Sequence, residues 1–266
     1  MTDGNTKARI AIVTGAAQGI GRAIALRLAD DGLDVAIVDL PSQRAKLEAL
    51  AEEIRGKNRE VLPLEADICV EEQVNEMVRQ TVSQLGGLDV LVANAGRIVV
   101  GSLIDSPLSD FDAIFNLNVR GTLLCYRAAG RFMIEQGRGG KIIGACSIAG
   151  KKGMMPLNGV YCASKAAIRS LTQTLAAELG RHRITVNAYA PGPVDTELMH
   201  TGGDATAKGL GLGDGATFMK AYLANAPLGR VGEPEDVAGL VSFLASKDSS
   251  YITGQILTID GGITMD

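Results

Sequence analysis

Short apolar runs alternate along the chain with longer amphipathic segments, and no other feature constrains the fold as strongly. Seven runs are expected to form strands: Arg9–Val13, Asp34–Val38, Glu60–Leu64, Asp89–Ala93, Lys141–Cys146, Thr185–Ala188 and Gln255–Ile259. Six segments have helical spacing: Ile20–Asp31, Gln43–Gly56, Val70–Leu85, Asp110–Gln136, Val160–Leu179 and Glu233–Ala245. The first four strands are almost wholly apolar, which is typical of a parallel sheet covered on both faces. Without repeats or linkers, the pattern predicts one doubly wound α/β domain of three layers over residues 1–266.

Composition excludes several classes of protein. The 266 residues are 46% hydrophobic and 21% charged, which suits a buried core and disfavours disorder. A net charge of −4 without a block of Lys or Arg argues against nucleic-acid and anionic-membrane partners. With no tryptophan and 4% aromatic residues, base stacking is also disfavoured.

The cysteines and histidines indicate no metal site. Four cysteines are far apart and form no C-x-x-C pair: Cys69, Cys125, Cys146 and Cys162. With only His182 and His200 in addition, we expect free thiols in a reducing compartment and no zinc. The N-terminus has no apolar segment typical of a secretory signal, and no run reaches the ~18 apolar residues of a membrane span. We therefore expect a cytoplasmic protein.

A glycine-rich turn joins the first expected strand to the first helix. Gly15, Gly19 and Gly21 follow the spacing G-x-x-x-G-x-G. Glycines at such a junction let the backbone turn tightly and approach a pyrophosphate, which then lies at the positive end of the helix. The turn predicts a dinucleotide site, with a purely structural glycine turn as the alternative.

Asp39, at the end of the second expected strand, indicates which dinucleotide binds. An acidic residue about 20 positions beyond the turn can accept hydrogen bonds from the adenosine ribose and repel a 2′-phosphate. Leu40 and Gln18 carry no positive charge that could pair with that phosphate. NAD is therefore expected, and nearby Arg44 keeps NADP as the alternative.

Three later strand ends belong to the same edge of the sheet. Asp67 could hold the adenine amino group, and the small residues of Asn94-Ala95-Gly96 leave room for the cofactor. After the sixth strand, the turn Pro191–Thr196 could bind the nicotinamide carboxamide through Thr196.

Ser147, Tyr161 and Lys165 form a second constellation. Tyr161 and Lys165 lie four residues apart on one face of an expected helix. A lysine cation beside a phenol lowers the phenol pKa from its usual value of about 10, as acid–base catalysis near neutral pH requires. Ser147 ends the fifth strand and could bind the same oxygen. Asn118, in the middle of an expected helix, could form a kink whose water links Lys165 to solvent.

A glycine-rich stretch, Thr201–Thr217, interrupts the helical pattern near the C-terminus. We interpret it as a long loop within a substrate lid at about 196–226, because long loops in compact domains are usually functional. A plain surface loop is the alternative.

These residues together resemble those of the classical short-chain dehydrogenases/reductases over essentially the whole chain. The matching residues are Thr14-Gly15-x-x-x-Gly19-x-Gly21, Asp67, Asn94-Ala95-Gly96, Asn118, Ser147, Tyr161-x-x-x-Lys165, Asn187 and Pro191-Gly192. The resemblance implies an NAD(P)-binding Rossmann-like fold with seven parallel strands and an Asn118–Ser147–Tyr161–Lys165 catalytic tetrad. It also implies a homotetramer, commonly built on two long helices and the C-terminal strand region.

Within that family, three stretches are similar to acetoin (diacetyl) reductases, 2,3-butanediol dehydrogenases and polyol dehydrogenases: Gly140–Ser147, Gly232–Ala238 and Tyr251–Gln255. Bacterial members of the subgroup often have Gln after the catalytic Ser, whereas this chain has Ile148. An apolar residue there offers no hydrogen bond to a second oxygen of a diol or hydroxyketone. Polar candidates for the pocket are Asn158, Lys151 and Lys152, and apolar ones are Met154, Met155 and Leu157.

The sequence thus predicts an NAD-dependent oxidoreductase that interconverts a secondary alcohol and a ketone, with a diacetyl- or acetoin-type substrate. A polyol or sugar substrate, or a catalytically silent NAD-binding scaffold, is the alternative. Residues expected at the cofactor are Gly15, Gln18, Gly19, Ile20, Gly21, Asp39, Leu40, Asp67, Ile68, Asn94, Ala95, Gly96, Tyr161, Lys165, Pro191, Gly192, Val194 and Thr196. Residues expected at the substrate are Ser147, Ile148, Ala149, Met155, Asn158 and Tyr161.

Overall fold

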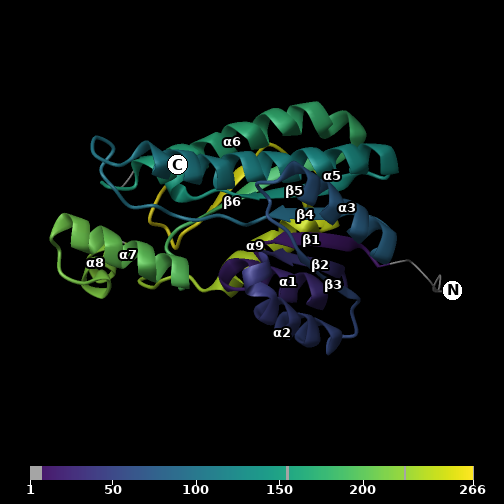
Figure 1. The fold of residues 1–266 in the computed structure, drawn as a ribbon, viewed down its shortest axis with the longest axis horizontal. Helices are drawn as coiled ribbons and strands as arrows, with labels where there is room; N and C mark the ends of the chain where they lie inside the picture. Colours follow the sequence, from purple (N-terminus) through teal and green to yellow (C-terminus); the bar gives the residue numbers. More distant parts are fainter. Residues whose placement is uncertain (1–7, 154–155, 225, 266) are drawn as a thin grey trace.

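Seven parallel strands form one sheet in the computed structural model, which describes residues 8–153, 156–224 and 226–265 (Figure 1). The strands are β1 (Ile10–Thr14), β2 (Asp34–Asp39), β3 (Val61–Glu65), β4 (Val90–Ala93), β5 (Gly140–Ala145), β6 (Ile184–Pro191) and β7 (Ile256–Ile259). Their order across the sheet is β3-β2-β1-β4-β5-β6-β7, and every neighbouring pair is parallel. The predicted doubly wound α/β fold is confirmed.

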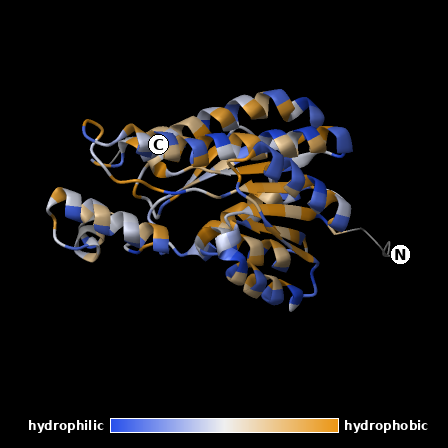
Figure 2. Cartoon of the chain, viewed as in Figure 1, coloured by the Kyte–Doolittle hydropathy of each residue, from blue (hydrophilic) through white to orange (hydrophobic). Residues whose placement is uncertain are grey.

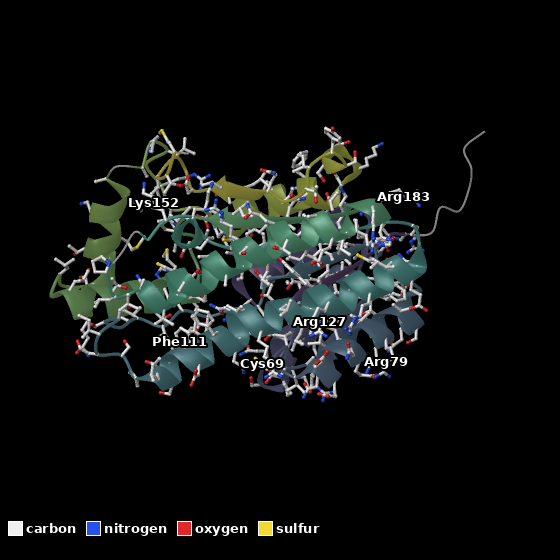
Figure 3. The ribbon with its side chains drawn as sticks, turned by 90° about the horizontal axis from the view of Figure 1, so that it is seen from above. Cys69, Arg79, Phe111, Arg127, Lys152 and Arg183 are labelled. Atoms are coloured by element: carbon white, nitrogen blue, oxygen red, sulfur yellow. The ribbon has the colours of Figure 1, made fainter. Side chains whose placement is uncertain are left out.

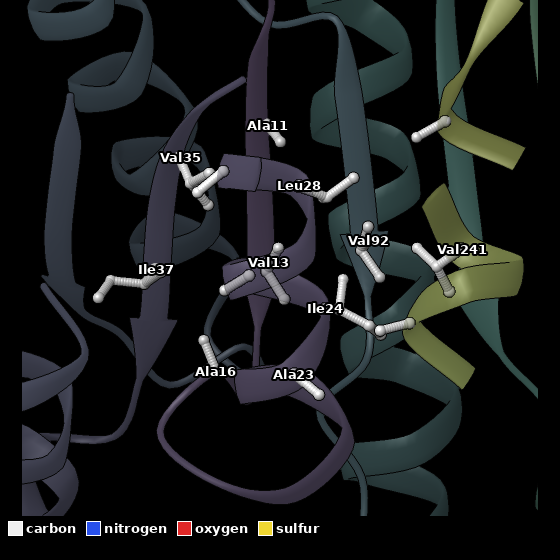
Figure 4. Close-up of a cluster of buried hydrophobic side chains, with 14 of the residues drawn as sticks. Ala11, Val13, Ala16, Ala23, Ile24, Leu28, Val35, Ile37, Val92 and Val241 are labelled. Atoms are coloured by element: carbon white, nitrogen blue, oxygen red, sulfur yellow. The ribbon is translucent and has the colours of Figure 1, made fainter. Parts of the chain in front are cut away.

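Helices cover both faces of this sheet and bury its side chains. One face packs against α1 (Gly19–Asp30), α2 (Arg44–Arg55) and α9 (Pro234–Ala245), and the other against α3 (Glu71–Leu85), α5 (Thr122–Gln136) and α6 (Gly159–Leu179). Successive strand residues alternate between these faces. Val13 therefore packs with Ile24 of α1 and Val241 of α9 (Figure 4), whereas Ile12 belongs to the opposite cluster. Figure 2 shows the resulting pattern, with an apolar sheet between helices whose outer surfaces are polar.

The strand order places the functional edge. From β1 the chain proceeds outward through β2 and β3, then returns to β4 beside β1 and continues outward on the other side. At this reversal the loops that follow β1 and β4 diverge, which opens a crevice at the carboxyl ends of the strands. The glycine turn, Asn94-Ala95-Gly96 and Ser147 all follow strands that end there.

The predicted single helix over Asp110–Gln136 is wrong in its detail. This region instead consists of three consecutive pieces: α4 (Leu108–Ile114), a π-helical segment (Phe115–Gly121) and α5. Single π-helical turns within α-helices are frequent at functional sites. Asn118 lies within this segment and is fully buried, so the kink expected at Asn118 coincides with a widened helical turn.

The predicted loop over Thr201–Thr217 is also wrong, because most of it is helical. Two helices, α7 (Glu197–Leu210) and α8 (Gly215–Leu223), extend away from the three layers (Figure 1). Thr196 caps α7 by accepting a hydrogen bond from the Met199 amide at 3.3 Å, and Gly211, with φ +68°, ends it. Small residues on one side of α7 are buried, and this packing outweighs the low helix propensity of glycine.

Candidate active site

The glycine turn after β1 fits the cradle that a dinucleotide requires. Gly15 and Gly19 have φ values of +64° and +54°, in the left-handed region that favours glycine. A Cβ atom on Gly15 would lie 2.8 Å from the Cα of Ala95, and one on Gly21 would lie 2.0 Å from the Gly15 carbonyl oxygen. The first turn of α1 carries no acidic residue, and its N-cap Gln18 makes no capping bond. This helix end is therefore suited to a pyrophosphate.

Asn94 holds the glycine turn in place. Its side-chain amide donates to the carbonyl oxygens of Thr14 and Gly15 at 2.9 and 3.1 Å. The buried Tyr189 hydroxyl donates to Asn94 Oδ1 at 2.7 Å. Predicted as a cofactor contact, Asn94 thus lies in the cavity wall with its side chain engaged in the protein. Tyr189 was missed, and its signal is a polar-tipped aromatic residue directly after the expected strand Thr185–Ala188.

At the adenosine end of the crevice, two carboxylates shape the backbone. Asp39 accepts hydrogen bonds from the amides of Ala17 at 3.0 Å and Leu40 at 2.9 Å. Asp67 accepts one from the amide of Cys69 at 2.9 Å. Both aspartates line the cavity and keep carboxylate lone pairs for a ligand.

The basic residues near this end differ from the expectation. Arg44, expected as the residue that could favour NADP, forms an exposed ion pair with Glu65 at 3.5 Å on the neighbouring strand. Lys46, which the sequence analysis did not consider, instead donates to the side-chain oxygen of Gln18 in the glycine turn. Lys46, which contacts the turn, lies two positions beyond the arginine that the spacing suggested.

Ser147 and Tyr161 meet at the other end of the crevice. Ser147 follows β5, is buried, and accepts a hydrogen bond from the Ala149 amide at 3.1 Å. Burial raises the pKa of Tyr161 to about 12, although its hydrogen bond with Ser147 acts in the opposite direction. The phenol therefore holds its proton at neutral pH.

The pKa of Tyr161 is raised above its usual value by burial, contrary to the sequence-based expectation that Lys165 lowers it. The Lys165 ammonium donates to the Ala145 carbonyl oxygen at 2.7 Å and lies 5.7 Å from the centre of the Tyr161 ring. Burial lowers the pKa of Lys165 itself to about 8. Sequence spacing shows that the two side chains share a helix face, but it does not show that burial shifts the pKa of each of them.

Asn118 connects the π-helical segment to α6. Its Oδ1 accepts from the Arg97 amide at 3.0 Å, and its Nδ2 donates to the Arg97 carbonyl at 2.9 Å and to Ser164 Oγ at 3.1 Å. A Cβ on Gly96 would lie 3.1 Å from Asn118 Oδ1 and 3.5 Å from Lys165 Nζ. Three of the four expected catalytic side chains, Ser147, Tyr161 and Lys165, are thus gathered at one place, and the fourth, Asn118, lies close to the Lys165 ammonium.

A cavity of about 790 Å³ runs along the whole edge, within the range of small-molecule sites. The sequence-predicted residues that line it are Gly15, Gln18, Gly19, Ile20, Gly21, Asp39, Leu40, Asp67, Ile68, Asn94, Ala95, Gly96, Tyr161, Lys165, Pro191 and Thr196. Residues not anticipated there include Leu117 and Asn116 of the π-helical segment, Arg97, Cys69 and Tyr189. Their common signal is a position within three residues of a motif already recognised.

Two expected cofactor residues do not line the cavity. A Cβ on Gly192 would lie 2.7 Å from that of Asp260, so this glycine allows close packing with the C-terminal segment. Val194 is buried and forms an isolated bridge with Gly232. Both shape the turn that leads to Thr196.

On the substrate side, Tyr161 lines the cavity, whereas Ser147, Ile148, Ala149 and Asn158 lie beside it in sequence and are not among the lining residues. Ile148 is buried at the start of a 3₁₀ turn, Ile148–Gly150, and Ala149 is half-buried. Asn158 is buried directly before α6, and Met155 lies outside the described residues.

The two lysines suggested as polar pocket groups do not line the cavity. Lys151 donates to Thr258 Oγ1 of β7 at 2.8 Å. Lys152 is exposed at the end of the molecule that carries α7 and α8, opposite Arg183 (Figure 3).

Within the described part of the chain, no cluster of three or more His, Cys, Asp or Glu residues could hold a metal ion. None of the helices found there is both long and apolar enough to cross a membrane.

Known proteins share this arrangement. A family model described as enoyl-(acyl carrier protein) reductase matches residues 15–264. A short-chain dehydrogenase/reductase of Armillaria gallica is 49% identical, with 98% of each chain covered. The chain belongs to the short-chain dehydrogenase/reductase family. It is an oxidoreductase of the alcohol and carbonyl type, like many members of the family.

Two further members carry more specific names. An (S)-acetoin-forming diacetyl reductase of Staphylococcus epidermidis is 42% identical, covering 96% of this chain and 98% of its own. The solved structure of an NAD⁺-bound xylitol dehydrogenase is 34% identical with a TM-score of 0.90, covering 97% and 100%. Since similar structures hold NAD⁺ in one case and NADPH in another, the family cofactor is a nicotinamide dinucleotide.

Proposed function

We propose that this short-chain dehydrogenase/reductase interconverts a secondary alcohol and a ketone with NAD, and that its substrate is a small hydroxyketone or diketone of the acetoin or diacetyl kind. The observation that carries the proposal is the half-buried Tyr161 phenol, hydrogen-bonded to Ser147, at one end of a cavity whose other end is a dinucleotide cradle. Similarity to a diacetyl reductase supports the substrate class.

Proton transfer is the part of the chemistry that this chain supplies. Because the pKa of Tyr161 is raised to about 12, the phenol is protonated at neutral pH and can protonate a carbonyl oxygen during reduction. Ser147 Oγ orients and polarises the same oxygen. When bound, the nicotinamide supplies or accepts the hydride at the substrate carbon.

Lys165 and Asn118 support that proton transfer. The Lys165 ammonium lies beside the Tyr161 ring and favours the phenolate that remains after the proton has left. It would also hold the nicotinamide ribose. Asn118 fixes the position of Gly96 and α6 through Arg97 and Ser164, and would order a water that relays protons to Lys165.

The cofactor is held by the cavity residues named above, together with Gly192 and Val194, which shape the last turn. Asp39 at the rim favours NAD, because its carboxylate can accept from ribose hydroxyls and repels a 2′-phosphate. Arg44 is paired with Glu65, which weakens the case for NADP.

The substrate lies against Ser147, Ile148, Ala149, Met155, Asn158 and Tyr161, and residues 196–226 cover it as a lid. The placement of α7 and α8 outside the three layers supports a covering role (Figure 1). A polyol or sugar alcohol is a second candidate, favoured by the TM-score of 0.90 with a xylitol dehydrogenase.

We also propose a cytoplasmic homotetramer. Large apolar side chains are exposed on α4 and before β7, with Leu108 at 79% and Tyr251 at 101% exposure. Such residues are typical of interfaces between copies of a chain. Light scattering of the purified protein tests the assembly, and a monomer at micromolar concentration would contradict it.

The function is tested by NADH and NADPH oxidation with diacetyl, acetoin, simple ketones and ketoses. We expect turnover of diacetyl or acetoin with NADH. Turnover of ketoses alone would identify a polyol dehydrogenase, and a preference for NADPH would show that Asp39 does not decide the cofactor. NADH binding without turnover of any carbonyl compound would indicate a silent scaffold.

A further inference from the structure

Asn158 carries a buried acceptor that nothing in the described part of the chain satisfies. The residue is 6% exposed, and its Oδ1 has no hydrogen-bond partner among the described residues. Leaving a buried polar group unsatisfied costs about 1–3 kcal/mol. Such an atom therefore needs an explanation.

Helix capping does not explain it. Asn158 is the N-cap of α6, a position where asparagine normally accepts from an amide in the first turn of the helix. Its side chain makes no such bond. The residue before it, Leu157, has a φ of +67°, which is a costly conformation for a branched side chain, and its carbonyl is fixed by the Gly101 amide at 2.7 Å. The backbone thus holds Asn158 in place under strain while its side chain stays unpaired.

The position of Asn158 connects it to the reacting groups. It is the N-cap of α6 and precedes Tyr161 by three residues and Lys165 by seven, a spacing that places it at the end of the helix face that carries both. Leucine side chains pack against the glycines near it. A Cβ on Gly159 would lie 2.5 Å from the Leu103 side chain, and one on Gly209 of α7 would lie 2.5 Å from that of Leu157. Next to Ser147, Ile148 is buried and offers no hydrogen bond.

We infer that Asn158 Oδ1 accepts a hydrogen bond from a hydroxyl group that the substrate carries next to its reacting carbon. The inference rests on the proposed function, because Ser147 and Tyr161 must hold the reacting oxygen. It narrows the substrate class to an α-hydroxyketone in the reducing direction and a vicinal diol in the oxidising direction. A diketone or a simple ketone carries no donor and would leave the acceptor unsatisfied. Asn158 thereby supplies the second polar contact that Ile148 lacks.

The test compares acetoin, 2-butanone and diacetyl as substrates for the wild type and for Asn158→Leu, which has a similar size and no polar atom. We expect the ratio of kcat/KM for acetoin to that for 2-butanone to fall about 10- to 100-fold, as expected for loss of a buried hydrogen bond. The melting temperature of the ligand-free variant should equal or exceed that of the wild type, because an unsatisfied polar atom has been removed. Asn158→Ala carries the same expectation if the leucine does not fit.

Thr185→Val is the matched control. Thr185 Oγ1 is also buried without a partner, but it lies at the start of β6, at the opposite edge of the sheet. This variant should leave the substrate ratio unchanged.

Several outcomes would overturn the inference. An unchanged ratio in Asn158→Leu would show that no substrate hydroxyl meets the acceptor. A lower melting temperature with equal loss on all substrates would assign Asn158 a structural role. A loss confined to diacetyl would show that the amide nitrogen faces a second carbonyl instead. Failure of the proposed function looks different, because the wild type itself would then oxidise NADH with none of the three compounds.

Discussion

Along the carboxyl edge of the sheet, the region around the glycine turn and the region around Tyr161 hold their polar groups differently. Near the turn, Asn94 and Asp39 make direct hydrogen bonds to the backbone. Near Tyr161, burial raises the pKa of Tyr161 and lowers that of Lys165, so that it favours the neutral form of each group. Asn158 Oδ1 has no hydrogen-bond partner among the described residues. In the first region the hydrogen bonds that preorganise the site also stabilise the fold. In the second region the desolvated and unpaired polar groups reduce the stability of the fold, and a bound ligand would offset that cost. Substitutions should therefore reduce cofactor binding in the first region and turnover, without loss of stability, in the second.

Tyr161→Phe should have the largest effect. Removing the proton donor should lower kcat about 10³-fold, within the range for general acid–base groups, while NADH affinity stays within about threefold. Steady-state kinetics and calorimetric NADH titration measure the two quantities. Tyr126→Phe is the matched control, because this buried hydroxyl bonds Thr172 at 3.0 Å and does not line the cavity. Normal turnover in Tyr161→Phe would refute the assigned chemistry.

Lys165→Met should stabilise the ligand-free protein at neutral pH. Burial lowers the pKa of Lys165 from 10.5 to about 8, so between these values the unfolded chain binds more protons than the folded one. The cost of the buried ammonium is complete below pH 8 and disappears as the pH rises toward 10.5. The variant should exceed the wild type in free energy of unfolding by up to about 3 kcal/mol at pH 7 and by much less at pH 10. Urea unfolding followed by circular dichroism measures this, and equal stabilities at both pH values would show that the ammonium is well solvated.

How much of each region can be predicted from the sequence depends on how far apart in the chain the interacting residues lie. The strands, the glycine turn and the Tyr161–Lys165 pair could be predicted because each depends on residues close together in the chain. The Tyr189–Asn94 bond could not, because it joins residues 95 positions apart. For the same reason the choice between Arg44 and Lys46 depended on where β3 places Glu65.

The helices α7 and α8 show a second limit. Local propensity disfavours a helix through Gly202, Gly203 and Gly209, and the prediction of a loop rests on that propensity. In the structure, burial of the small side of α7 and its caps at Thr196 and Gly211 decide the outcome. The predicted pKa direction of Tyr161 was wrong for a related reason, since desolvation depends on all the elements packed around a group.

Gly21→Ala should disrupt the preorganised region directly. A Cβ there would lie 2.0 Å from the Gly15 carbonyl oxygen, so the backbone of the turn must shift. We expect NADH affinity to fall about 100-fold, because about 3 kcal/mol corresponds to that factor. Gly180→Ala is the control, since a Cβ at Gly180 would have no neighbour within 4 Å. Retained affinity in Gly21→Ala would show that the turn is pliable.

Tyr189→Phe should have a smaller effect on the same region. It removes only the hydroxyl that bonds Asn94 Oδ1 at 2.7 Å and leaves that acceptor without its donor. A loss of about 1–2 kcal/mol should raise the KM for NADH about tenfold, with kcat nearly constant. A fall in kcat at constant KM would place Tyr189 with the reacting groups of the second region instead.

Asp195→Asn should have the smallest effect, because it alters a largely exposed contact between the Thr196 turn and α7 at the cavity. Asp195 Oδ1 lies 2.7 Å from His200 Nε2, and both side chains are more than half exposed, at 52% and 63%. Exposed pairs contribute at most about 1 kcal/mol, so the KM for substrate should change about twofold. Lys208→Gln, a charge change elsewhere on α7, is the control. A change above tenfold in Asp195→Asn alone would mean that one surface contact, rather than the buried small residues of α7, positions the helix. The lid at 196–226 would then be held to the rest of the protein mainly by an exposed contact rather than by buried packing.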